Sequence, residues 1–179
     1  MARAGAFEIL YREYYRRVFG LCRRLLSSAD LAEDATQEVF VLAYRNFGRY
    51  DHERPFWQWI AAIASNHCVD LLRARGRRQA LFDDDAEDPE TLPSGDAPVL
   101  NEIISNEDAA ALNEAISSLP DKYRVPLVLA YYHRASYEEI AEQLGVTTNH
   151  VGVLLLRARQ RLRERCSEGL NEGEGGAER

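Results

Sequence analysis

Residues 136–163 read SYEEIAEQLGVTTNHVGVLLLRARQRLR, and this stretch decides the fold of the second half of the chain. Ser136 and Glu139 have the spacing of a capping box, which starts a helix. Gly145 suits the positive φ of a tight turn, and Thr147 can cap a second helix. Apolar residues flank the turn at spacings that let two helices pack: Ile140, Ala141, Leu144, Val151 and Leu155. The pattern predicts a helix-turn-helix, and an ordinary hairpin of two helices is the alternative.

The second helix of this motif is apolar in its middle, where residues 151–156 read VGVLLL. Successive residues of a helix are rotated by about 100°, so four residues fall on one face, which is expected to pack in the core: Val151, Leu155, Ala158 and Leu162. Val153, Leu154 and Leu156 lie on other faces, so at least one of them is expected to face solvent or a partner. The five arginines between 157 and 165 alternate and therefore divide between two sides. One side can meet phosphates, while the other pairs with acids or is solvated.

The chain has 179 residues and a net charge of −7, but this charge is unevenly distributed. Residues 83–118 contain 11 acids and no base, whereas residues 1–82 have a net charge of +4 and residues 119–179 are neutral. Within the acidic part, residues 83–98 also contain three prolines, which is typical of a solvated linker. We therefore expect an all-α protein with two small helical domains joined by a flexible acidic linker. The predicted parts are residues 1–80, the linker 81–106, a helix-turn-helix domain at 107–166, and a polar tail at 167–179.

The remaining segments also show helical periodicity. The first lobe has apolar residues at spacings of three and four between residues 7 and 25. Asp30 and Glu33 predict the start of a second helix, which runs to about Phe47, and Pro55 suits the first turn of a third. The third helix is expected to bury Ile60, Ile63, Ala64, His67 and Leu71. In the second lobe, helices are predicted at 107–119 and from Asp121 to about His133.

Several protein classes are disfavoured by composition and motif content. No apolar run reaches the roughly 20 residues that span a bilayer, and no secretory signal is present, so we expect a cytoplasmic protein. Cys22, Cys68 and Cys166 are odd in number and far apart, which indicates neutral core thiols and no disulfide framework. No phosphate-binding loop, metal-spaced cluster or nucleophile elbow occurs, so neither an enzyme, a metal nor a cofactor is expected.

Four stretches in series resemble the extracytoplasmic-function (ECF) group of the bacterial sigma-70 family. They are AEDATQEVFVLAYRNF (32–47), FWQWIAAIASNHCVDLLR (56–73), ISSLPDKYRVPLVLAYYHRASYEEIAEQLGV (116–146) and RARQRLR (157–163). The resemblance covers nearly all of residues 7–165, in the family's order. It implies a protein that binds core RNA polymerase and directs it to promoter DNA, with an anti-sigma factor as a further partner that holds it inactive.

The resemblance also assigns roles to residues. The first lobe would dock on polymerase through a stripe of its second helix, Asp34, Gln37, Glu38 and Val41, with Phe40 flanking the stripe. The same lobe would bind and melt the −10 element through Tyr50, Arg54, Phe56, Trp57, Asn66, Asp70, Arg73 and Arg77. Aromatic rings there can stack on an unpaired base, asparagine can bond a base edge, and arginine can hold phosphate.

The second lobe would recognise the −35 element through Thr147, Thr148, Asn149, His150, Val153, Leu156, Arg157 and Arg161. The sequence departs from the family here, because Gly152 and Leu154 stand where relatives usually have basic residues. Direct hydrogen bonding to bases is therefore reduced, although Val153 or Leu156 can contact a thymine methyl. Two alternatives stay open: the apolar face binds protein instead of DNA, or the chain is a stand-alone helix-turn-helix regulator acting on an operator. Binding to core polymerase discriminates the regulator from a sigma factor.

Overall fold

The computed structural model describes residues 2–75 and 109–174, and all secondary structure in these residues is helical, which confirms the all-α prediction. The chain divides into two units, each with its own internal packing. Unit 1 comprises residues 1–81 together with 128–135, and unit 2 comprises residues 82–127 and 136–179. The predicted linker at 81–106 and Arg77 lie outside the described residues.

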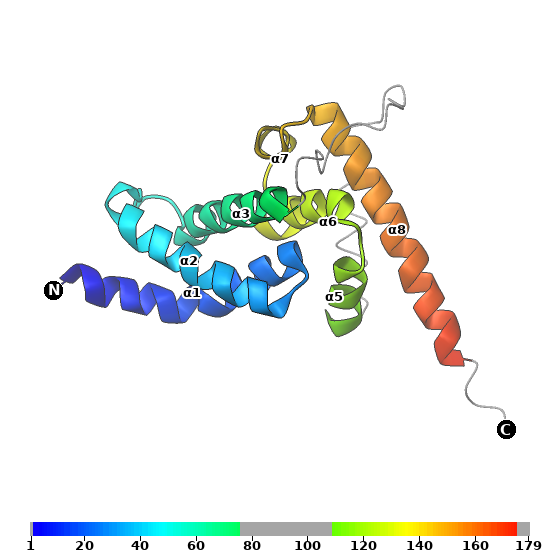
Figure 1. Ribbon diagram of the computed structural model, residues 1–179, viewed down its shortest axis with the longest axis horizontal. Helices are drawn as coiled ribbons and strands as arrows, with labels where there is room; N and C mark the ends of the chain where they lie inside the picture. The colour runs from blue at the N-terminus through cyan, green and yellow to red at the C-terminus, as the bar shows by residue number, and fades with distance from the viewer. Residues whose placement is uncertain (1, 76–108, 175–179) are drawn as a thin grey trace. The chain divides into compact units, whose positions relative to one another are not determined.

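Unit 1 is built on three helices that pack on one another: α1 (Ala2–Leu26), α2 (Ala29–Asn46) and α3 (Phe56–Arg75) (Figure 1). A short 3-10 turn, Phe47–Arg49, follows α2. The side chains that are fully shielded from solvent come from all three helices: Val18, Leu25, Val39, Ile60 and Ala64. Burying each large apolar side chain contributes about 1.5–3 kcal/mol, so this interface holds the three helices together.

The start of α2 differs from the prediction. Its N-cap is Ser28, whose side chain accepts a hydrogen bond from the backbone N–H of Leu31, and not Asp30. The chain reverses at Ser27, which adopts a left-handed φ of 53°, and the next residue is therefore the extended one that caps the helix. Asp30 lies in the first turn, where a negative charge interacts favourably with the helix N-terminus.

The buried face of α3 is wider than predicted and partly displaced. Ile60 and Ala64 are buried as expected, but Ile63, His67 and Leu71 are only half-buried. The rest of the buried face consists of Phe56, Ala61, Ser65, Cys68, Val69 and Leu72. The difference arises because α3 packs against both α1 and α2, so two adjacent stripes of the helix are covered instead of one.

Two of the three cysteines meet in the core of unit 1. Cys22 on α1 and Cys68 on α3 are free thiols with no exposed surface, as expected for core residues. The hydrogen bond between them, and then burial, raise the pKa of Cys68 well above its ordinary value, while the same bond lowers the pKa of Cys22. The Cys68 thiol is therefore the donor and stays protonated.

Unit 2 contains α5 (Ala109–Ser117), α6 (Asp121–Val128), α7 (Tyr137–Leu144) and α8 (Thr148–Glu174), with α5 and α7 both packing on α8. The junction between α5 and α6 is closed by a buried arginine. Arg124 Nη1 donates to the carbonyl of Leu119 at 2.9 Å, and Nη2 forms an ion pair with Asp121 Oδ1 at 2.6 Å. The Arg124 side chain is only 5% exposed, whereas that of Asp121 is 37% exposed, so removing Asp121 would take a charge partner from a buried guanidinium, which is destabilising.

The helix predicted from Asp121 to His133 is present, but it changes from an α-helix to a π-helix near its end. Its first part is α6, and its last turn is the π-helix Leu129–His133, which packs on α3 within unit 1. In unit 1, His133 Nδ1 lies 3.3 Å from Ser65 Oγ, and the guanidinium of Arg24 lies 4.3 Å from the Tyr132 ring centroid. Arg134, in a left-handed conformation with φ of 61°, ends the helix.

The helix-turn-helix prediction is confirmed in its local details. Ser136 Oγ accepts from the Glu139 N–H at 3.2 Å, and Glu139 Oε2 accepts from the Ser136 N–H at 2.7 Å, which completes the capping box. Gly145 has a φ of 71° and ends α7. Thr147 Oγ1 accepts from the His150 N–H at 3.2 Å and so caps α8. The residues that hold α7 to α8 are buried as predicted: Ile140, Ala141, Leu144, Val151 and Leu155.

Candidate polymerase and promoter interfaces

One face of α2 presents a polar stripe to solvent. Asp34, Gln37 and Glu38 are exposed, and Val41 follows them with 41% of its surface accessible. Their spacings of three, four and seven residues bring them onto a single face. The structure thus brings together four of the five residues predicted to bind polymerase, on a surface whose acids suit a basic partner.

The fifth residue, Phe40, lies beneath this stripe. It is only 4% exposed, and its ring packs 4.7 Å from Tyr11 and 6.3 Å from Phe7 of α1. Phe40 therefore supports the stripe and does not lie on its surface, which corrects its predicted position. Two tyrosines at the edge of these aromatic contacts reach solvent: Tyr11 is 39% exposed and Tyr44 is 44% exposed. Sequence reasoning missed both, although Tyr44 follows Val41 by one helical turn.

The predicted −10 aromatics belong to a packed cluster in unit 1. The ring of Tyr50 lies 5.1 Å from Trp59, 4.9 Å from His52 and 5.4 Å from Phe56, and its hydroxyl donates to the carbonyl of Arg54. Phe56 is 5% exposed. Phe56 is therefore buried within the cluster, whereas Tyr50 is half-buried at its edge, beside the loop between α2 and α3.

Trp57 is placed differently from the other aromatics. It is half-exposed at the first turn of α3, and the guanidinium of Arg17 lies 3.8 Å from its ring centroid. A cation over the face of tryptophan is attracted by the ring quadrupole, so Arg17 fixes the orientation of Trp57. Arg17 was not among the predicted residues. It reaches Trp57 because α1 packs on α3, and no local sequence pattern indicates that contact.

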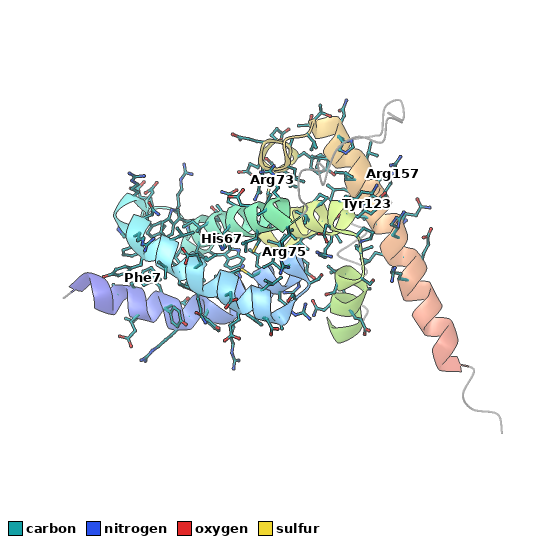
Figure 2. The ribbon with its side chains drawn as sticks, viewed as in Figure 1. Phe7, His67, Arg73, Arg75, Tyr123 and Arg157 are labelled. Atoms are coloured by element: carbon teal, nitrogen blue, oxygen red, sulfur yellow. The ribbon has the colours of Figure 1, made fainter. Side chains whose placement is uncertain are left out.

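The polar −10 residues lie along one exposed face of α3. Asn66, Asp70 and Arg73 are all exposed, at spacings of four and three residues. Arg73 Nη1 lies 3.8 Å from Asp70 Oδ1, and Arg54 Nε lies 3.5 Å from Asp51 Oδ2. Exposed pairs of this kind contribute less than about 1 kcal/mol, so the guanidinium groups can exchange these carboxylates for phosphates. Arg73 and Arg75 stand at the end of α3 (Figure 2).

The start of α8 offers polar groups in the order predicted. Thr147, Thr148 and Asn149 are exposed, and His150 is half-buried. They surround the N-terminus of a helix whose dipole attracts anions. This end of α8 is therefore suited to approach the negatively charged DNA backbone.

The apolar middle of α8 is more deeply buried than expected. Leu156 is 42% exposed, which confirms that VGVLLL is not buried completely. Val153 and Leu154, however, are 6% and 3% exposed, so Val153 does not lie where it could contact a base. The sequence prediction assumed that only one face of this helix is covered. In the structure both α5 and α7 pack on α8, so more of its surface is buried.

Farther along α8, arginines line a hollow of about 660 Å³ whose other wall is Tyr123 of α6. The hollow is lined by Tyr123, Arg157, Gln160, Arg161, Glu164 and Arg165. Tyr123 and Arg157 are labelled in Figure 2. Arg161, predicted to bind DNA, places its guanidinium 4.6 Å from the Tyr123 ring centroid. Arg157 is half-buried at the same hollow. The two arginines are one turn apart, but Arg161 already has an aromatic partner within unit 2.

Within residues 2–75 and 109–174, no group of three or more histidine, cysteine or acidic residues is arranged to hold a metal ion. None of the helices in these residues is both long enough and apolar enough to cross a membrane.

Comparison with known proteins gives a consistent result across both units. Residues 10–78 match the family Sigma-70 region 2, and residues 109–162 match Sigma-70, region 4. The chain is 34% identical over 162 residues to the RNA polymerase sigma-H factor of Pseudomonas aeruginosa, covering 87% of this chain and 83% of that protein. It is 31% identical over 169 residues to the ECF RNA polymerase sigma factor SigW of Bacillus subtilis, covering 91% and 90%.

A solved structure has a similar fold. It is the sigma factor RpoE of Bartonella quintana in complex with the anti-sigma factor NepR, with a TM-score of 0.59 and 22% identity over 90% of this chain and 97% of that one. The matched regions, their order and the identity to ECF relatives lead to one conclusion. The chain belongs to the sigma-70 family of RNA polymerase sigma factors, in its extracytoplasmic-function group.

Proposed function

We propose that this sigma factor binds core RNA polymerase through the exposed stripe of α2, melts the −10 element with unit 1, and recognises the −35 element with unit 2. The observation that supports the proposal most directly is the order of the two family matches, residues 10–78 and then 109–162, on one chain. Each match contains an exposed polar face of the kind that its role requires.

In unit 1, polymerase binding is assigned to Asp34, Gln37, Glu38 and Val41. Acids at this spacing attract a basic helix at long range, and Val41 with Tyr44 adds apolar area that is removed from water on docking. The −10 role is assigned to Trp57, Asn66, Asp70, Arg73 and Arg54. Trp57 has the half-exposed ring that can stack on an unpaired base, and the polar face of α3 can hold the strand.

In unit 2, −35 recognition is assigned to the first turns of α8. Asn149 and His150 can reach base edges, Thr148 can contact a phosphate, and Arg157 can hold a phosphate or a guanine. Leu156 is the exposed apolar residue that can meet a thymine methyl. With few bidentate groups, each contributing about 1–3 kcal/mol of discrimination, this −35 element is expected to be recognised loosely.

We further propose that an anti-sigma protein holds the chain inactive. The solved relative from Bartonella quintana is bound to an anti-sigma factor, and the exposed Leu156 gives a local reason for an apolar partner here. Recovery of the chain from its native cells, followed by mass spectrometry of whatever co-purifies, tests this. A chain that is always free, with activity set only by its amount, would contradict it.

The central experiment combines this chain with core RNA polymerase and sequences the transcripts made from genomic DNA in vitro. Initiation at a defined set of sites, absent with polymerase alone, is the expected result. The chain by itself should bind duplex DNA weakly, because the net charge of residues 83–118 is −11 and repels phosphate. Tight binding to one operator without polymerase would instead identify a stand-alone regulator.

A further inference from the structure

A small cluster of polar side chains is buried where the three helices of unit 1 meet. Cys22 comes from α1, Thr36 from α2 and Cys68 from α3, and each of them is 0% exposed. None of the three belongs to the proposed polymerase or promoter faces. Burying a polar group is unfavourable unless it is hydrogen-bonded, so the partners of these side chains decide what the cluster can do.

Hydrogen bonds join the three side chains in a chain that runs from α3 to α2. The Cys68 thiol donates to Cys22, and Cys22 is bonded in turn to the side chain of Thr36. The Thr36 hydroxyl donates its hydrogen to the carbonyl of Ala32 at 2.5 Å, so it accepts from the Cys22 thiol. Cys22 therefore connects α2 with α3, and a chemical change at its sulfur alters its contacts with both helices.

Two free thiols in direct contact can be oxidised to a disulfide. Cys22 and Cys68 lie on helices that pack on each other, so the bond would cross-link α1 to α3. The bond from Cys68 lowers the pKa of Cys22, which makes Cys22 the thiol that more readily forms the nucleophilic thiolate. A peroxide is the class of oxidant that suits a buried site, because a molecule of its size enters a helical core during local opening.

We propose that a peroxide converts Cys22 and Cys68 into a reversible disulfide, and that this bond weakens the docking of α2 on core polymerase. First, the Cys22 thiolate attacks one peroxide oxygen, the O–O bond breaks, and the other oxygen leaves as hydroxide, which the thiol proton converts to water. Next, the Cys68 sulfur attacks the sulfenic acid of Cys22, and the S–O bond breaks. The hydroxyl group leaves with the Cys68 proton as a second water, so the two sulfurs have given two electrons to the peroxide.

The effect on α2 follows from the position of Thr36. A disulfide holds its sulfurs about 2 Å apart, closer than any hydrogen bond, and it removes the hydrogen that Cys22 donates to Thr36. Thr36 lies between Asp34 and Gln37 in the sequence, on the buried side of the helix whose exposed side carries the stripe. Because interiors are close-packed, the shift at Cys22 is transmitted to α2. This regulatory effect rests on the proposed docking of α2 on polymerase.

The first test detects the bond itself in the full chain carrying Cys166→Ala, which leaves Cys22 and Cys68 as the remaining cysteines. Hydrogen peroxide, followed by N-ethylmaleimide to trap free thiols, should give a tryptic pair that joins the two cysteines and separates in dithiothreitol. A further Cys68→Ala change should give sulfenic acid at Cys22 and no linked peptide. The proposal fails if no linked peptide forms at a peroxide concentration that oxidises free cysteine completely in the same solution. Peptide mapping of the Cys166→Ala chain decides this even where Cys68→Ala does not fold.

The second test compares the oxidised and reduced Cys166→Ala chains, freed of peroxide, in binding to core polymerase. The oxidised chain should bind about tenfold more weakly, and dithiothreitol should restore its affinity. A chain in which Cys22→Ala and Cys68→Ala are also present is the control, and peroxide treatment should leave its affinity unchanged. Equal affinities of the linked and reduced chains would overturn the regulatory effect. If the reduced chain does not bind polymerase at all, the proposed function of α2 fails, whereas the disulfide is judged separately by the first test.

Discussion

The long helices α2 and α8 were both predicted to face a partner, yet they match the prediction to different degrees. On α2, every polar residue of the predicted stripe is exposed, and the aromatic Phe40 alone lies underneath. On α8, the polar first turn is exposed as expected, but Val153 is buried and Arg161 lies over Tyr123. The α2 surface is continuous and polar, whereas the residues of α8 are divided among exposed polar, core and aromatic-bound positions.

The difference has a physical origin. A polar residue on an exposed helix face is placed by the helical period alone, because it gains nothing by turning inward. An apolar or long cationic residue is drawn to whatever neighbour removes it from water or offers a ring, and that neighbour comes from another part of the chain. A stripe such as that of α2 is therefore suited to rigid docking, while α8 retains few groups for base recognition.

The largest effect is expected from reversing charge on α2. Glu38→Lys should weaken binding to core polymerase by at least about 30-fold, since breaking a charge pair at an interface costs about 2–5 kcal/mol. Its helix content should not change, because the residue is exposed. Co-purification and a quantitative pull-down with core polymerase provide the measurement.

Glu13→Lys is the matched control for this change, because Glu13 is an exposed acid on α1. It should bind polymerase normally at physiological salt. Equal losses from the two variants would indicate a general charge effect and remove α2 from the interface.

Local rules predicted much of the fold. The capping box at Ser136 and Glu139, the positive φ of Gly145 and the cap at Thr147 each depend on residues within four positions, and each was confirmed. The predicted start of α2 was wrong because two residues only two positions apart, Ser28 and Asp30, can both cap a helix. The left-handed Ser27, which decides between them, has no marked sequence signature.

Features set by tertiary packing were not predictable in the same way. Cys22 and Cys68 meet only because α1 packs on α3, and Arg17 reaches Trp57 for the same reason. The displaced core face of α3 likewise reflects two covering helices, which a single-helix wheel does not represent. Periodicity indicates that a face is buried, but the neighbours determine how wide that face is.

The next largest effect concerns base recognition by α8. Arg157→Ala should reduce initiation about 10- to 100-fold on the preferred −35 sequences, the loss expected for one bidentate contact. Leu156→Ala should instead flatten the preference at one position, because a thymine methyl loses its apolar partner. Initiation across a library of −35 sequences measures both.

Arg161→Ala serves as the comparison for Arg157, since its guanidinium is engaged by Tyr123. It should change initiation less than threefold. Unchanged base preference in both Arg157→Ala and Leu156→Ala, together with lost binding to a protein partner, would show that this face of α8 is a protein interface.

Val153 and Leu156 of α8 were both predicted to contact DNA, but their alanine variants should differ in the free energy of unfolding. Val153→Ala should destabilise unit 2 by about 1–2 kcal/mol, because Val153 is 6% exposed and its removed methyl groups leave a gap. Leu156→Ala should cost less than about 0.5 kcal/mol, because Leu156 is 42% exposed. Calorimetric melting of the full chain distinguishes them, and equal costs would contradict the difference in burial.

The smallest expected effect lies at the contact between Arg17 and Trp57. Arg17→Ala removes a cation–π interaction that contributes about 0.5–1 kcal/mol at an exposed site, so promoter opening should fall about two- to fivefold. Fluorescence of 2-aminopurine in the −10 element measures opening directly, and Arg16→Ala, an exposed neighbour on α1, is the charge-matched control. Arg17→Lys should restore less than the arginine supplies, since a planar guanidinium stacks on the indole and an ammonium does not. If Arg17→Ala and Arg16→Ala reduce opening equally, positive charge on α1 matters and the orientation of Trp57 does not.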